Sequence, residues 1–194
     1  MVTYAVSGYS LVELVFTIGL MTTLSGMAVP QIMTAMDDYR TAGAARYIST
    51  RMHQTRMEAV KRSADVALQF AQTAQGIGYA AYVDGNGNGV RTPDIQRGID
   101  RRLGFVERLP DRFAGVDFGV LPGLPPPEGS APPGSDPIKL GSRNLLSFSA
   151  VGTSSSGSVY IRGRGAQYVV PVFGETGKTR VLKFNVRANR WSPL

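Results

Sequence analysis

The chain has 194 residues, with 21 Lys and Arg against 14 Asp and Glu and a formal net charge of +7. This length fits one domain, or one domain with an appendage, and excludes a large multidomain enzyme. With no cysteine and one histidine, the sequence excludes a disulfide framework, a cysteine-based zinc site and a cysteine nucleophile. The 23 Gly and 12 Pro favour a loop-rich β domain everywhere except near the N-terminus.

Residues 11–29 form an apolar run that contains a single charge, Glu13. As a helix, this run extends roughly 29 Å, which is close to the thickness of a bilayer core. A helix buried in a soluble core would show a polar stripe, but this run is apolar or small on every face. A cleaved secretory signal would begin with basic residues, and residues 1–8 contain neither Lys nor Arg. We therefore expect a membrane-spanning helix over residues 9–29.

Glu13 is the unusual residue of this run, because a carboxylate inside an apolar helix is costly unless a cation neutralises it. The plausible local cation is a free α-amine, which would lie nearby if the chain were cut just before Tyr9. A cut after Gly8 would place the new amine about one helical turn from Glu13. The amine could pair with Glu13 of its own chain or of a neighbouring subunit, and pairing with a neighbour would set subunit register.

At these residues the sequence resembles the type IV pilins and the pseudopilins of type II secretion. The resemblance implies that prepilin peptidase cuts after Gly8, that Tyr9 becomes the N-methylated first residue and that Glu13 acts in assembly. Pro30 stands where many such proteins have a helix-bending proline. The chain departs from the usual pattern in having Tyr9 rather than Phe at this position, and in a leader, residues 1–8, without a basic residue.

Beyond Pro30, apolar residues recur at spacings of three and four, with basic residues between them. The recurring residues are Met33, Met36, Tyr47, Ile48, Met52, Ala59 and Val60. We expect an amphipathic helix over residues 30–62 that continues the membrane helix through a bend at Pro30. Alternating apolar residues then predict two short strands, at 66–70 and 77–83, with a turn at 84–89.

The turn at 84–89, DGNGNG, resembles the start of a calcium loop, with oxygen-bearing side chains at its first, third and fifth positions. The twelfth residue of such a loop would be a bidentate Glu, but here it is Ile95. Gly and Asn also serve a tight turn that needs positive φ angles. We expect turn chemistry rather than a metal site, and no cofactor.

Residues 91–112 mix acids and bases and predict a solvated connection or the edge of a sheet. Residues 119–137 hold seven prolines and predict an extended surface loop, with a Pro-rich ligand for a partner as the alternative. Further strands are predicted at 145–150, 159–162, 168–173 and 181–187, forming an antiparallel sheet.

The region after the apolar run also resembles the GspH/FimT family of pseudopilins. The resembling pieces are YISTRMHQTRMEAVKRSADVAL, the DGNGNG turn and the terminal RVLKFNVRANRW. The resemblance implies a pilin-like α+β fold. In that fold a long N-terminal helix, half transmembrane and half amphipathic, packs on a β-rich domain at residues 63–194. The Pro-rich loop departs from the shorter family pattern.

The excess positive charge lies at the C-terminus, where residues 143–194 contain eight Lys and Arg against one acid, Glu175. Strand alternation predicts that Lys183 and Arg187 share one side while Phe184 takes the other. A basic face with Arg190 and the neighbouring Trp191 would attract phosphate backbones without reading their sequence. The alternatives are a solvated surface, or one attracted to anionic lipid or acidic partner subunits.

Some minor pilins of the FimT type bind DNA for uptake through C-terminal arginines, and this tail resembles theirs in composition. Gly163-Arg164-Gly165 and residues 186–190 approximate the Gly-Arg-x-Arg motif of that group without copying it. The resemblance therefore implies an alternative function, a DNA-binding minor pilin at a pilus tip, with Lys183, Arg187 and Arg190 as candidate contacts.

Catalysis is disfavoured, because His53 lies in the amphipathic helix and no second imidazole or nucleophile elbow accompanies it. The sequence instead predicts a minor pilin or pseudopilin held in the bacterial inner membrane by one helix, with its β-rich domain in the periplasm. The expected partners are other pilins, prepilin peptidase, the inner-membrane assembly platform and the lipid bilayer, with DNA as the alternative. A secretion pseudopilus and a type IV pilus remain equally open.

Overall fold

The computed structural model describes residues 8–127, 133–141 and 144–194. The chain divides into two compact units, Met1–Met36 and Asp37–Leu194. Residues 1–7 of the predicted leader, residues 128–132 of the predicted Pro-rich loop and the basic residue Arg143 lie outside the described residues.

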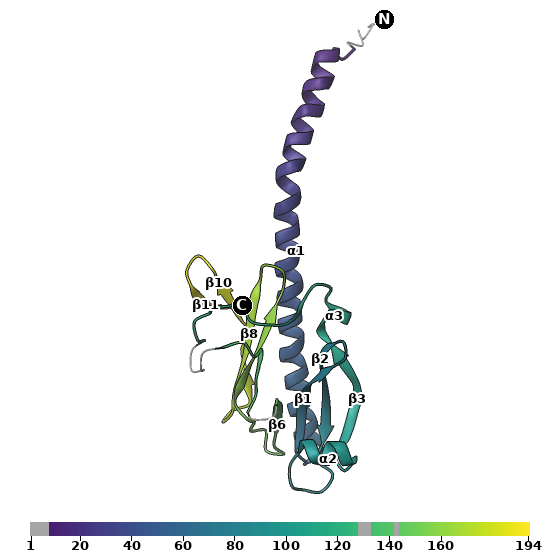
Figure 1. Ribbon diagram of the computed structural model, residues 1–194, viewed down its shortest axis with the longest axis vertical. Coiled ribbons are helices and arrows are strands. Elements are labelled where there is room, and N and C mark those ends of the chain that lie inside the picture. Colours follow the sequence, from purple (N-terminus) through teal and green to yellow (C-terminus); the bar gives the residue numbers. More distant parts are fainter. Residues whose placement is uncertain (1–7, 128–132, 142–143) are drawn as a thin grey trace, which may run out of the picture. The chain divides into compact units, whose positions relative to one another are not determined.

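One long helix, α1 (Leu11–Arg62), contributes to both units (Figure 1). Its backbone continues through Pro30, although proline offers no N–H for the helical hydrogen bond. In the first unit, every side chain from residue 8 to residue 36 is exposed. The helix ends with Lys61 and Arg62 in its last turn, where positive charge is favourable, and Ser63 then adopts a left-handed φ of 50°.

The first sheet has four antiparallel strands in the order β3-β2-β1-β6. β1 (Val66–Thr73) and β2 (Gly76–Val83) form a hairpin, as their alternating apolar residues predict. β3 (Arg101–Arg108) and β6 (Leu145–Phe148) are the two edge strands. Two short helices, α2 (Thr92–Arg97) and α3 (Leu109–Arg112), flank β3 in the chain.

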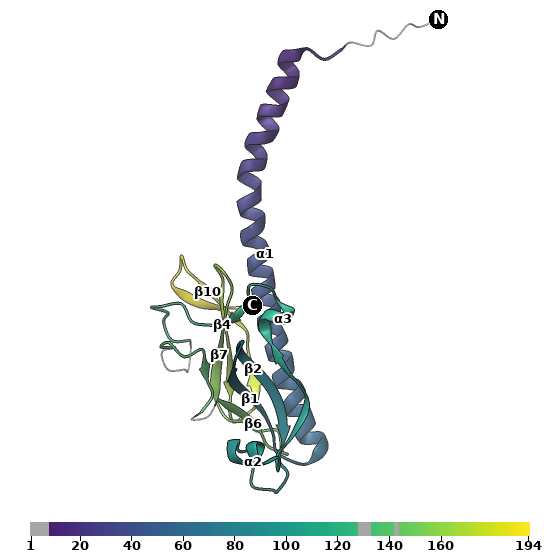
Figure 2. The same cartoon turned by 45° about the vertical axis from the view of Figure 1, so that its right-hand side comes forward.

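The second sheet follows the order β11-β10-β8-β7-β4 and is also antiparallel. Figure 2 labels its strands β4, β7 and β10. Its central strands are β7 (Gly157–Arg162) and β8 (Gln167–Phe173). The outer strands are β4 (Asp117–Phe118), β10 (Leu182–Asn185) and β11 (Arg190–Pro193). Two further short strands extend it, since β5 (Ile138–Lys139) pairs with β7 and β9 (Lys178–Thr179) pairs with β8.

The core of the second unit forms where residues 37–62 of α1 pack against both sheets. Buried helix residues recur every three or four positions: Thr41, Ala42, Ala44, Ala45, Ile48, Met52, Thr55 and Ala59. Phe118 of β4 stands edge-on to Phe70 of β1 and Tyr79 of β2, at 5.5 and 5.9 Å between ring centroids, and so joins the sheets. The predicted α+β class, a long N-terminal helix packed on antiparallel β-structure, is confirmed.

Several local details differ from what the sequence indicates. Among the recurring apolar residues of the helix, Ile48, Met52 and Ala59 are buried, whereas Met33, Met36 and Val60 are exposed. The β-strands form two sheets rather than one. The strand predicted at 181–187 ends at Asn185, because a turn follows in which Asn189 has a φ of 46°. The chain then returns as β11, which the sequence did not predict.

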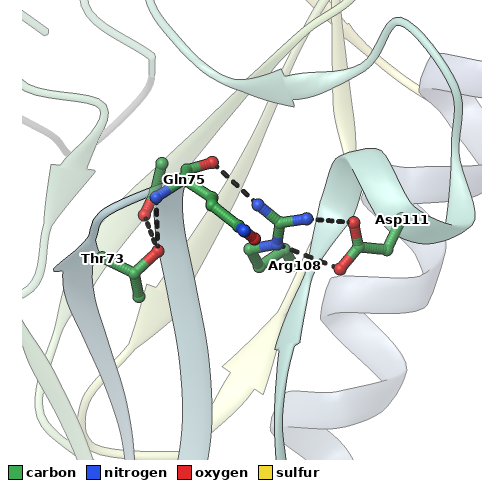
Figure 3. Close-up of polar contacts among 5 residues, drawn as sticks. Thr73, Gln75, Arg108 and Asp111 are labelled. Carbon is green, nitrogen blue, oxygen red and sulfur yellow. Dashed lines mark hydrogen bonds and ion pairs between the residues drawn. The ribbon is translucent and has the colours of Figure 1, made fainter.

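The mixed-charge segment 91–112 contains α2, β3 and α3, and β3 is indeed a sheet edge. Arg108, one of the charged residues of this segment, makes structural contacts (Figure 3). Its guanidinium donates to the Gln75 carbonyl at 2.9 Å and to the Asp111 carboxylate, whose pKa is lowered by this hydrogen bond. The charges therefore tie the β1–β2 turn to α3.

Candidate functional site

The predicted cleavage bond, between Gly8 and Tyr9, lies in non-helical backbone just before α1. Ser10 caps the helix, because its side-chain oxygen accepts the N–H of Glu13 at 3.2 Å and its carbonyl accepts the N–H of Leu14 at 3.1 Å. Glu13 consequently lies in the first turn, where the helix dipole favours a carboxylate. Among the described residues, Glu13 has no ion-pair partner.

The apolar part of α1 is long and hydrophobic enough to cross a bilayer, with an 18-residue stretch of mean hydropathy 1.6, none of it buried. Its threonine hydroxyls are satisfied within the helix. The hydroxyls of Thr22 and Thr34 donate to the carbonyls of Ile18 and Pro30, at 2.7 and 3.0 Å. These bonds need no water, so the segment fits a single-pass membrane anchor.

Asp37 holds the helix of the second unit to the loop between β7 and β8. Its carboxylate accepts the backbone N–H groups of Arg164 at 3.0 Å and Gly165 at 2.8 Å. Gly163 permits this approach, because a Cβ on it would lie 2.2 Å from the Thr41 hydroxyl oxygen. The Gly163-Arg164-Gly165 segment partly matches a DNA-binding motif. Its backbone is hydrogen-bonded to the helix, while the Arg164 side chain is exposed.

Asp38 makes a second attachment to the same sheet. Its carboxylate accepts a hydrogen bond from the Tyr168 hydroxyl at 2.8 Å and forms an ion pair with Lys183 at 2.6 Å. Burial, followed by this hydrogen bond, raises the pKa of Tyr168. Sequence reasoning missed Asp37 and Asp38, although two adjacent acids in a helix whose other charges are mostly basic were a usable signal.

The opposite side of the helix is attached to the first sheet. Arg51 forms an ion pair with Glu107 of β3 at 2.7 Å, and the Tyr47 hydroxyl donates to the same carboxylate. The Arg112 guanidinium lies 4.7 Å from the centre of the Tyr47 ring. Tyr47 and Arg51 belong to the segment that resembles the GspH/FimT family, and both hold the helix to the first sheet through Glu107.

The three candidate DNA contacts are not equivalent. Lys183 is half-buried and paired with Asp38, so it does not belong to an open basic face. Arg187 and Arg190 are exposed at the β10–β11 turn, and neither has an ion pair with a described carboxylate. The strand alternation that predicted a shared face for Lys183 and Arg187 does not extend to Arg187, because β10 ends at Asn185.

Trp191 covers the second sheet rather than standing free. Its indole N–H donates to the Pro125 carbonyl at 2.9 Å, and its ring contacts those of Tyr160 and Phe184. Part of the predicted Pro-rich loop therefore packs on the domain, since Leu124 and Pro127 are buried as well.

The turn at 84–89 is held by its own hydrogen bonds. The Asp84 carboxylate accepts backbone N–H groups from Asn86, Gly87 and Gly89 at 2.7–3.0 Å. Burial alone would raise the pKa of Asp84, but these hydrogen bonds outweigh it and the pKa is lowered. Within the described ranges, no group of three or more His, Asp or Glu could hold a metal ion. Turn chemistry accounts for the motif.

His53 takes part in a contact between the helix and β9. Its Nε2 lies 3.0 Å from the Thr179 hydroxyl oxygen, which is also 2.7 Å from the Ser49 hydroxyl oxygen. These three side chains join α1 to the second sheet, and this packing accounts for the position of the histidine.

The family model of the type II transport protein GspH matches residues 44–177, which is more than half of the chain. The chain belongs to the GspH family. The GspH match covers residues 44–62 of the helix and the strands as far as β8. The apolar N-terminal segment and the β10–β11 hairpin lie outside it.

One curated relative agrees with this assignment. The pilin-like protein PilA1 of Thermus thermophilus is 36% identical to the chain over 84 residues, which are 42% of this chain and 50% of PilA1. The match thus spans about half the length of that relative. No solved structure matches. Together, the GspH match and PilA1 support a structural subunit of a pilus or secretion system.

Proposed function

We propose that the chain is a minor pilin or pseudopilin that is cut by prepilin peptidase after Gly8, methylated at Tyr9 and packed into a filament through its apolar helix. The observation that carries the proposal is the fully exposed apolar segment of α1, with Glu13 in its first turn, joined to a GspH-family domain. An exposed helix of this kind needs lipid or neighbouring helices to cover it.

In this proposal the helix exchanges lipid for neighbouring helices, which cover the same apolar surface without a large change in hydration. Glu13 pairs with the N-terminal amine of a processed subunit, which removes the cost of an isolated carboxylate in an apolar layer. The peptidase, the inner-membrane assembly platform and other pilins are the partners, and the β-rich domain lies in the periplasm before assembly.

The experiment is intact-mass spectrometry with N-terminal sequencing of the protein extracted from membranes of its native host. The expected chain starts at Tyr9 and carries one added methyl group. A Gly8→Ala variant is the control for processing, and it should retain the leader. A wild-type chain that still starts at Met1 would contradict the maturation step.

The second candidate is a FimT-like minor pilin that binds DNA at a pilus tip. The supporting observation is the exposure of Arg187 and Arg190 at the β10–β11 turn, without carboxylate partners among the described residues. Lys183 no longer supports this function, because Asp38 neutralises it. The two functions differ in a measurable way, since phosphate contacts make affinity depend steeply on salt.

A further inference from the structure

The second sheet carries a row of side chains on the face opposite the core. Lys139 of β5 pairs with Ser158 of β7, and Ser158 pairs with Pro171 of β8. Arg180 continues the row, because its N–H donates to the Pro171 carbonyl at 3.3 Å. Adjacent residues in the strands, Val159 and Val170, belong to the hydrophobic core, so the row faces away from it.

A groove of about 800 Å³ lies over this row. Its apolar lining includes Tyr160, Pro171 and Phe173. The volume falls within the range of sites that hold a drug-sized molecule or a short peptide segment. The turn between β8 and β9 forms one wall, and Lys139 of β5 lies on the other side.

The rim of the groove is positively charged. Lys139, Lys178 and Arg180 are exposed and have no ion pair with any described carboxylate. Of the described lining residues, Glu175 alone is acidic. The Arg180 guanidinium lies 5.6 Å from the centre of the Phe173 ring, which holds a cation beside the apolar lining.

The Tyr160 side chain adds an unusual polar group to the lining. Its hydroxyl is shielded from solvent and has no hydrogen-bond partner in the described part of the chain. Buried polar groups in native proteins are nearly always hydrogen-bonded. Burial raises the pKa of Tyr160 to about 12, and the hydroxyl is protonated at neutral pH as any tyrosine is.

We propose that this groove docks an extended, acidic peptide segment of a partner protein. Strands are spaced about 4.8 Å apart, so Lys139 and Arg180 stand roughly 14 Å apart across the sheet, too far for one small anion to reach both. An extended peptide with several carboxylates and apolar side chains matches both the charged rim and the apolar lining.

Other occupants fit less well. A flat anionic bilayer cannot enter a concave site, and duplex DNA presents a charged backbone outside, with its thymine methyl groups inside the major groove and away from Pro171 and Phe173. A second copy of this chain is disfavoured by its net charge of +7. The proposal goes beyond filament assembly through the apolar helix, because the groove lies wholly within the second unit.

The test uses the full chain in non-ionic detergent and fluorescein-labelled octapeptide pools, measured by fluorescence anisotropy. One pool combines Asp and Glu with apolar residues, a second replaces the acids by Asn and Gln, and a third replaces them by Lys and Arg. The acidic pool should bind, and the double variant Lys139→Gln/Arg180→Gln should weaken its binding by about tenfold or more. The matched control Arg187→Gln/Arg190→Gln removes the same charge elsewhere and should change binding less than about twofold.

Three results would overturn the proposal: no preference for the acidic pool over the amide pool, an equal loss in both double variants, or no binding of any pool. Anionic phosphatidylglycerol vesicles and a short DNA duplex serve as competitors. If either competitor displaces the acidic peptides, and this displacement depends on Lys139 and Arg180, the groove binds that competitor instead. Peptide binding is measured independently of processing at Gly8. A negative result would therefore overturn the proposed peptide site without contradicting the proposed role in filament assembly.

Discussion

Asp38 attaches the helix to the second sheet through two partners. Its two partners, Tyr168 and Lys183, come from adjacent strands, β8 and β10. Tyr168 is fully buried, so losing its acceptor would leave a buried hydroxyl unpaired. Lys183 is partly exposed, and the ion pair itself therefore contributes less than the buried hydrogen bond.

Asp38→Ala should lower the free energy of unfolding by about 2 kcal/mol, because an unpaired buried hydroxyl costs roughly 1–3 kcal/mol. Asp38→Asn should cost less, since its amide oxygen still accepts from Tyr168. Urea denaturation of the full chain in detergent, followed by circular dichroism, measures the difference. Glu175→Ala, which removes an exposed acid, is the matched control and should change stability by less than about 0.5 kcal/mol. Equal effects of Asp38→Ala and Glu175→Ala would contradict the role of Asp38.

The pH dependence gives a second readout of the same contact. The pKa of Tyr168 is raised by burial and by Asp38, so the folded state holds this proton more tightly than the unfolded state. Its contribution to stability is complete below a pH of about 10 and is lost as the pH rises towards the raised pKa. In Tyr168→Phe this alkaline loss should be smaller, and Asp38→Ala should then cost less than it does in the wild type.

At the scale of elements, the β10–β11 hairpin decides whether the DNA-binding alternative holds. That function predicts that Arg187→Ala/Arg190→Ala lowers affinity for a short DNA duplex and reduces the slope of log affinity against log salt by about 2, one unit for each lost phosphate contact. Anisotropy titrations at several salt concentrations measure this slope. The matched control is Lys139→Gln/Arg180→Gln, which should leave it unchanged. A wild-type affinity that does not fall with salt would rule out the alternative.

Elements with local periodicity could be predicted from the sequence, and those defined by distant partners could not. The alternation of Leu68 and Phe70 indicated β1, and the spacing of Ile48, Met52 and Ala59 indicated the buried helix face. Helices α2 and α3 span six and four residues, too short for a periodic pattern to be visible. Strand alternation placed Lys183 on an open basic face. The sequence around Lys183 could not show that its partner is Asp38, because the two residues are far apart in the chain.

The candidate site divides in the same way. Glu13 stands out from its neighbours by charge alone, so the sequence was enough to single it out. The groove beside Tyr160 is assembled from β5, β7, β8 and β9, and β5 is separated from β7 by a segment that includes β6, a strand of the other sheet. Its lining residues Lys139 and Arg180 share no motif, and only the strand register brings them into one row.

At the scale of the whole molecule, the proposed function requires Glu13 for joining other subunits and not for folding. The carboxylate lies outside the second unit, whose core is formed by α1 residues beyond Asp37 and by the two sheets. Replacing it by an amide therefore leaves that core unchanged, and it makes the apolar segment easier to hold in lipid. What is lost is the charge that would pair with the amine of a neighbouring processed subunit.

Glu13→Gln should therefore leave membrane insertion and cleavage after Gly8 intact while reducing the amount of protein in sheared filament fractions by about tenfold, which corresponds to about 1.4 kcal/mol of lost pairing energy. Quantitative immunoblots of membrane and filament fractions from the native host measure the ratio. Glu58→Gln makes the same chemical change on the soluble part of α1, where Glu58 pairs only with Arg62 among the described residues, and should not alter incorporation. Equal incorporation of Glu13→Gln and Glu58→Gln would show that the Glu13 carboxylate has no part in assembly, because a protein without that charge would then enter filaments as well as one that keeps it.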